Sequence, residues 1–265
     1  MKTLGMTKNR NGLIRLFVVG TLILFACAFH TTARAVGGED LFAQGNRAYA
    51  EARYDEALKF YKEVAGKEGY STSLLYNMAN AYYHKRDVGQ AILHYRRALY
   101  LDPANTDIKA NLYLAQKDFG LISEKVLLWH KYFDLLNINL WILIASGAFA
   151  SLSLLLLLRG IFPRLLPRSL LKVVPMFFLL IFVVSGTGAA VKYGEMNQSV
   201  VVRDNAKLLV SPFDSAASFA SIKNGRVVRM EKAYGGYLFV EVQGGRSGWI
   251  QEKAIEPIVP SGEIG

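Results

Sequence analysis

Residues 74–103, LLYNMANAYYHKRDVGQAILHYRRALYLDP, decide the fold of the N-terminal half of this 265-residue chain. They align with residues 41–65, LFAQGNRAYAEARYDEALKFYKEVA, at an offset of 34 residues that brings Tyr61 onto Tyr95. Small residues and tyrosines recur at helical spacing in both copies. A repeat of this length and pattern predicts pairs of antiparallel helices that stack on one another.

The second copy resembles the tetratricopeptide repeat. Small residues let the two helices of such a repeat approach closely, and a proline ends the second helix. The resemblance implies an all-α tetratricopeptide repeat domain over residues 36–120, in which Asp107–Phe119 repeats only the first helix and caps the open end of the stack. The residues that carry the resemblance are Leu75, Ala79, Tyr82, Ala91, Tyr95, Ala98 and Pro103.

Repeats of this family have a concave surface that typically holds an extended peptide or a partner helix. An asparagine amide offers a peptide backbone both a donor and an acceptor. An aromatic side chain at these positions either packs within the fold or contacts a ligand, and the sequence leaves both open. Transfer of the family's groove positions gives Phe42, Asn46, Tyr49, Tyr76, Asn77, Asn80, Tyr83, His84 and Asn111.

One subtype of the family clamps a partner's C-terminal carboxylate with lysines beside the asparagines. In this sequence Phe42 occupies the first of those lysine positions, and Asp107 occupies a later one. We therefore do not expect carboxylate clamping.

Residues 1–35 are predicted to be a secretory signal peptide. A basic region is followed by the apolar stretch Leu16–Phe29, and Ala33-Arg34-Ala35 has the small-x-small pattern of cleavage sites. The alternatives are a lipoprotein signal ending at Cys27 and an uncleaved anchor. All three place the following domain outside the cytoplasm.

Two uncharged stretches, residues 138–158 and 173–191, predict a two-helix transmembrane hairpin. As helices they measure about 31 Å and about 28 Å, which matches a hydrocarbon core of about 30 Å. The loop between them, residues 159–172, contains four basic residues and no acid. Since basic loops stay in the cytoplasm, we expect both folded domains on the periplasmic side of a bacterial inner membrane.

Residues 121–137 join the repeat to the first stretch. They mix apolar and basic residues and include Trp129 and Tyr132, which suit the headgroup region. We predict an interfacial helix, or one continuous with the first span.

Residues 197–258 alternate short apolar runs with turn signals such as Asn224-Gly225 and Gly244-Gly245, which predicts a small all-β domain. The closing residues 237–250 resemble the last strands of bacterial SH3-like domains, which implies an SH3-like barrel. Trp249 is expected in the barrel core rather than in a ligand site. The predicted strands are Val200–Val202, Lys207–Val210, Val227–Met230, Leu238–Val242 and Trp249–Ile250.

Charge and composition exclude several classes of function. The formal net charge is +10, but residues 1–35 and 159–172 contribute +5 and +4 of it, so no basic face for nucleic acid is predicted. Cys27 is the only cysteine, and no HxH or HExxH pattern is present. We expect no metal, no cofactor and no enzyme activity.

The order of a signal, a two-copy repeat, a basic-looped hairpin and a terminal SH3-like domain resembles the E-type family of the Bat aerotolerance group. The resemblance implies membrane-anchored von Willebrand A-domain proteins as partners and a link to oxygen or stress tolerance. We predict an envelope adaptor whose repeats bind a partner protein or peptide. The alternative is a cell-wall or peptide-binding envelope-stress protein that acts through its SH3-like domain.

Overall fold

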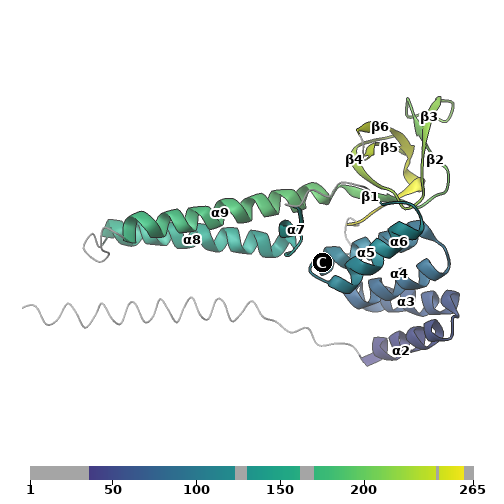
Figure 1. Ribbon diagram of the computed structural model, residues 1–265, viewed down its shortest axis with the longest axis horizontal. Helices are drawn as coiled ribbons and strands as arrows, with labels where there is room; N and C mark the ends of the chain where they lie inside the picture. Colours follow the sequence, from purple (N-terminus) through teal and green to yellow (C-terminus); the bar gives the residue numbers. More distant parts are fainter. Residues whose placement is uncertain (1–35, 123–129, 162–169, 243–244, 260–265) are drawn as a thin grey trace, which may run out of the picture. The chain divides into compact units, whose positions relative to one another are not determined.

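The computed structural model describes residues 36–122, 130–161, 170–242 and 245–259 (Figure 1). The predicted signal peptide and most of the predicted basic loop lie outside these residues. The described residues from Gly38 onward form one compact unit.

Five helices form the N-terminal stack, as the 34-residue period predicts (Figure 1). Each helix packs against the next, and the buried faces carry the small residues and tyrosines of the repeat, with Tyr61 and Tyr95 almost fully inaccessible to solvent. The helices are α2 (Val36–Ala50), α3 (Tyr54–Glu68), α4 (Thr72–His84), α5 (Val88–Leu101) and α6 (Thr106–Asp118).

The backbone repeats with the same period as the sequence. Ala52, Arg86 and Gly120 follow the first helix of successive copies at intervals of 34 residues, and all three have a positive φ, at 57°, 64° and 64°. This left-handed conformation is disfavoured for residues with a Cβ atom. The turn that follows the first helix therefore imposes it in every copy.

Side-chain caps fix where three of the helices begin. Ser71, Asp87 and Asn105 each precede a helix, and a side-chain oxygen of each accepts a hydrogen bond from the backbone N–H three residues later, at 3.2, 3.4 and 3.1 Å. Such caps satisfy donors that the first helical turn leaves unpaired.

Two long apolar helices follow the stack, after the one-turn helix α7 (His130–Phe133). They are α8 (Ile138–Ile161) and α9 (Leu170–Glu195), and they pack side by side (Figure 1). Both are long and apolar enough to cross a membrane by length and composition, and most of their side chains are exposed. They extend beyond the predicted stretches, so that Arg159 and Lys192 lie within helices rather than in flanking loops.

The prediction of a helix over residues 121–137 is wrong at residues 121–122 and 134–137. The positive φ of Gly120 ends the repeat, and Leu121 is buried in the same core cluster as Ile92 instead of facing an interface. Of the described part, only α7 is helical. Residues 123–129, with Trp129, lie outside the described residues.

The C-terminal part is a seven-stranded antiparallel sheet with the strand order β3-β2-β6-β5-β4-β1-β7. All five predicted runs overlap strands, whereas β3 and β7 were not predicted. The strands are β1 (Gln198–Val201), β2 (Ala206–Leu209), β3 (Ser218–Ile222), β4 (Val227–Tyr234), β5 (Tyr237–Val242), β6 (Arg246–Gln251) and β7 (Ile255–Pro257), with a 3₁₀ turn at Glu252–Ala254.

Trp249 does not lie in the core of the sheet, contrary to the prediction. Successive residues of a strand point to opposite faces, and its neighbour Ile250 takes the core position at 1% exposure. The half-buried indole packs instead against Phe239, with ring centroids 5.3 Å apart, and the Nζ atom of Lys232 lies 4.9 Å and 5.4 Å from the two ring centroids.

The sheet packs directly on the second helix of the complete repeat. Val200 and Ile258 belong to the core cluster that contains Ile92. At the start of α5, a Cβ atom added to Gly89 would lie 2.1 Å from Asn224 Oδ1 and 2.7 Å from the Cα atom of Val202. A residue with a side chain cannot occupy this position without separating the two elements.

Polar contacts supplement this packing. Gln90 Nε2 donates to Glu256 Oε1 at 2.8 Å, and Arg97 donates to the backbone oxygen of Pro257 at 2.9 Å. The sheet thus covers a surface of the stack that a two-copy repeat would otherwise leave exposed.

Replacement of Ala52 by glycine should raise the free energy of unfolding by about 0.5–1 kcal/mol, because glycine adopts a positive φ without steric cost. The matched change Ala43→Gly, at an exposed site inside α2, should lower it by about 1 kcal/mol. Denaturant unfolding of both variants in detergent checks this. If both variants change the free energy of unfolding in the same direction, the turn geometry at Ala52 is contradicted.

Replacement of Gly89 by alanine should lower the free energy of unfolding by about 1–3 kcal/mol, because the new methyl group overpacks the contact between α5 and the sheet. The matched change Gly66→Ala in α3 has no atom within 4 Å of the new methyl group and should stabilise by about 0.5–1 kcal/mol. Thermal unfolding measures both. An unchanged melting temperature of Gly89→Ala would show that the sheet does not pack against the start of α5.

Candidate functional site

Eight of the nine predicted groove residues line two depressions of about 220 and 230 Å³ that share Tyr49. We call this surface the asparagine groove. The first depression is lined by Tyr49, Tyr76, Asn80, Tyr83, His84, Tyr95, Asn111 and Leu114, and the second by Asn46, Tyr49, Tyr61 and Asn77. Phe42 lines neither depression and packs against the ring of Tyr61, with centroids 5.9 Å apart.

Tyrosines from the second helix of each copy hold asparagines from the first. The Tyr61 hydroxyl donates to Asn46 Oδ1 at 2.8 Å, and the Tyr95 hydroxyl donates to Asn80 Oδ1. The two pairs are equivalent, 34 residues apart. Each bond fixes the plane of an amide at the floor of the groove and occupies its oxygen.

Two further asparagines complete the row. Asn77 Nδ2 donates to Asn46 Oδ1 at 2.9 Å, and Asn111 Nδ2 donates to the hydroxyl of Tyr76. In Asn77 and Asn111 the amide nitrogen is the hydrogen-bonded group, whereas the amide oxygen stays open within the described residues. Among the residues that the structure describes, no partner is present for Nδ2 of Asn46 and Asn80 or for Oδ1 of Asn77 and Asn111. The groove therefore offers two donors and two acceptors.

Burial keeps the supporting hydroxyl groups protonated. It raises the pKa of Tyr61 to about 12 and raises the pKa of Tyr95 still further. Desolvation disfavours the phenolate in both cases. Both hydroxyl groups are therefore hydrogen-bond donors throughout the physiological pH range.

An aromatic cluster forms one end of the groove. The exposed ring of His84 stacks on Tyr54 at a centroid distance of 5.0 Å and an interplanar angle of 5°. It meets Tyr49 and Tyr83 edge-to-face at 5.8 and 5.5 Å. The Tyr83 hydroxyl donates to Asp118. These aromatic residues thus pack on one another and also line the groove.

His94 lies outside the groove. It is buried against the ring of Tyr82, its Nδ1 atom lies 2.8 Å from the backbone oxygen of Gln90, and burial lowers its pKa to about 3. The imidazole is therefore neutral at physiological pH and serves the packing of α5.

The supporting residues of the groove, Tyr61 and Tyr95, were not predicted as site residues from the sequence. Tyr61 and Tyr95 are buried in the stack, and their hydroxyl groups also position the amides. The signal was present as a tyrosine 15 residues after an asparagine in both copies. Tyr54, which stacks on His84, has no counterpart in the second copy, where Val88 occupies the equivalent position.

Comparison with protein families matches residues 73–105 to the tetratricopeptide repeat. The match covers α4 and α5, which supply Tyr76, Asn80 and Tyr95 to the groove. No curated protein matches the chain. The chain therefore contains a tetratricopeptide repeat, a module that mediates interactions between proteins.

The hydrogen bond between Tyr95 and Asn80 should contribute about 0.5–1.5 kcal/mol to stability. A double-mutant cycle of Tyr95→Phe and Asn80→Ala should give a coupling energy of that size, measured by denaturant unfolding. The control cycle combines Tyr95→Phe with Asn46→Ala. Because Asn46 accepts its hydrogen bond from Tyr61 and not from Tyr95, the effects of these two changes on stability should be additive. Coupling in the control pair alone would contradict the assignment of partners.

Proposed function

We propose that this protein is a membrane-anchored adaptor whose asparagine groove binds an extended segment of a partner protein. The observation that carries the proposal is the repeated tyrosine–asparagine hydrogen bond, which orients unpaired amide groups along one surface. An extended peptide backbone presents alternating N–H and C=O groups, and these amides complement both.

The groove chemistry favours the middle of a peptide over its C-terminus. Capture of a carboxylate calls for cations, and the first expected lysine position holds Phe42, which is packed against Tyr61. Asp107, at the later position, is exposed and acidic. The aromatic cluster around His84 adds a surface for an apolar side chain of the partner.

The two apolar helices supply the anchor in this proposal. Their exposed side chains include many leucines, valines and phenylalanines, and a lipid bilayer would cover them. The basic residues between the helices favour a cytoplasmic loop, which would leave the repeat and the sheet in the periplasm.

The partner that we propose is a membrane-anchored von Willebrand A-domain protein, within a Bat-type complex linked to oxygen or stress tolerance. Support comes from the order of the modules along the chain. We propose a binding protein and not an enzyme, because its distinctive surface consists of neutral amides and aromatic rings.

Loss of the groove amides should abolish partner binding without unfolding the repeat. In the variant Asn46→Ala/Asn80→Ala, two free donors disappear, and recovery of the von Willebrand A-domain protein after detergent solubilisation should fall at least tenfold. The control Gln44→Ala removes an amide that donates to Asp40 in its own helix, and recovery should stay unchanged. If the wild type, the double variant and Gln44→Ala all recover the same amount of partner, the groove assignment is wrong.

Topology can be tested independently with single cysteines in a Cys27→Ser background. Cysteines at the exposed positions Ser73 and Ser247 should react with an impermeant maleimide in intact spheroplasts. A cysteine at Ser169 should react only after permeabilisation. Labelling of position 169 from outside would overturn the proposed orientation.

A second candidate function rests on the row of Lys232, Phe239 and Trp249 across three neighbouring strands. Such a partly exposed aromatic surface suits a cell-wall glycan or peptide. Retention of the protein on isolated peptidoglycan, lost in Trp249→Ala, would favour this function over the adaptor.

A further inference from the structure

A cavity of about 260 Å³ lies where α5, α6, α8, α9 and β1 meet. Its lining contains three cations and two carboxylates, which leaves one net positive charge. Apolar side chains complete the wall. The charged residues are Arg96, Lys109, Lys192, Asp134 and Glu195, and the apolar ones include Leu99, Leu112, Ile138 and Ile258.

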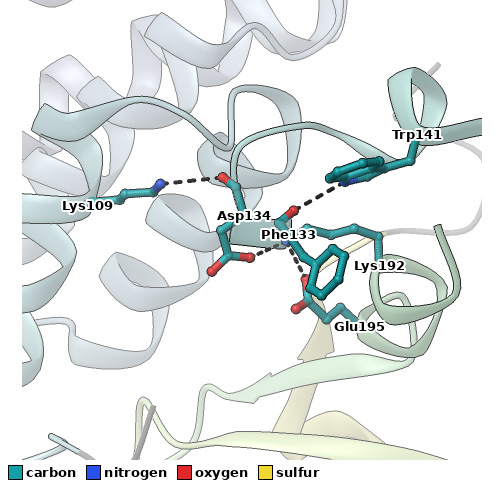
Figure 2. Close-up of polar contacts among 6 residues, drawn as sticks. All are labelled: Lys109, Phe133, Asp134, Trp141, Lys192 and Glu195. Atoms are coloured by element: carbon teal, nitrogen blue, oxygen red, sulfur yellow. Dashed lines mark hydrogen bonds and ion pairs between the residues drawn. The ribbon is translucent and has the colours of Figure 1, made fainter. Parts of the chain in front are cut away.

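Both carboxylates already have a partner in the cavity wall. Figure 2 shows Lys192 between Asp134 and Glu195, and the Lys192–Glu195 distance is 3.0 Å. Lys109 reaches the backbone oxygen of Asp134 at 3.5 Å. The ammonium group of Lys192 therefore satisfies the acids and ties the end of α9 to the segment before α8.

Arg96 differs from the two lysines. Its Nε atom is inaccessible to solvent and has no hydrogen-bond partner, and no other residue that the structure describes accepts a hydrogen bond from its guanidinium group. The side chain is half-buried, and Asp134 and Glu195 attract its charge without accepting a hydrogen bond from it, so its N–H groups lose hydration that hydrogen bonds do not replace. The guanidinium group of Arg96 therefore lines the cavity with N–H donors that no acceptor in the described part of the chain occupies.

The position of the cavity indicates where such an acceptor would come from. Ile138 is the first residue of α8, and Lys192 and Glu195 lie in the last turn of α9, so both apolar helices end at the cavity. Trp141 donates its indole N–H to the backbone oxygen of Phe133 at 3.3 Å (Figure 2), and Tyr193 is 68% exposed. Such aromatic residues mark the headgroup level of a bilayer.

We propose that this cavity binds the phosphate group of an anionic phospholipid, with Arg96 as its main contact. A guanidinium group presents several N–H donors in one plane and matches phosphate oxygens well. The apolar wall is suited to the glycerol and the first acyl carbons. The inference rests on the membrane anchoring proposed above.

Native mass spectrometry of the full chain in detergent tests the site, with phosphatidylglycerol as the probe. The wild type should retain a bound lipid, and Arg96→Gln should weaken retention about tenfold or more, as loss of a charged hydrogen bond implies. The control Arg229→Gln removes a nearby arginine that pairs with Glu241 on the sheet, and it should bind as the wild type does. Equal retention by Arg96→Gln and wild type would overturn the proposal.

Thermal unfolding separates binding from structure. Without lipid, Arg96→Gln should melt at the same temperature as the wild type or higher, because it removes a partly desolvated cation that makes no hydrogen bond to the described residues, and Lys192 continues to pair with both acids. With phosphatidylglycerol, only the wild type and Arg229→Gln should gain stability. A lower melting temperature of lipid-free Arg96→Gln would assign Arg96 a structural role and overturn the proposal.

Inorganic phosphate distinguishes the two sources of the same chemistry. It should stabilise the wild type far less than phosphatidylglycerol does. If inorganic phosphate alone stabilises the wild type as much as phosphatidylglycerol does, and Arg96→Gln removes this effect, the assignment of a lipid is wrong. The cysteine labelling described above tests the membrane anchor separately. If the hairpin is not inserted but lipid binding still depends on Arg96, the proposed anchor is wrong and the proposed lipid site stands.

Discussion

The close contact between the first turn of α5 and strand β1 is the constraint on which the other features depend. At Gly89 the helix approaches the backbone of Val202 so closely that a methyl group would not fit. This approach lets Val200 and Ile258 join the core of the repeat. A stack of two repeats and a capping helix thereby gains an apolar neighbour that its own sequence does not provide.

Because α5 is held on one side by the sheet, its other faces are fixed as well. An α-helix turns by about 100° per residue, so three consecutive side chains point to three different surroundings. Tyr95 holds an amide of the groove, Arg96 faces the cavity beside the apolar helices, and Arg97 bonds to the sheet. One rigid helix thus connects the proposed partner site with the proposed lipid site.

The polar groups of the two sites differ in how they are satisfied. In the groove, neutral amides have one end bonded within the chain and the other end open, which suits a reversible, neutral ligand. In the cavity, the half-buried guanidinium group of Arg96 has no hydrogen-bond acceptor among the described residues, which suits a permanent anionic occupant. The first arrangement fits exchange of partners and the second fits anchoring.

Local patterns in the sequence determined the helices of the repeat and the two apolar stretches, because a fixed period places equivalent residues on equivalent faces. The family resemblance supplied eight of the eleven residues that line the groove. Only the tertiary structure decided that Phe42 packs away from the groove, that Leu121 is buried, that Trp249 lies outside the sheet core and that the sheet packs on α5. These outcomes depend on contacts between residues as far apart as Gln90 and Glu256, 166 positions along the chain. A periodic pattern shows which face of an element is apolar, but it does not show which distant element will cover that face.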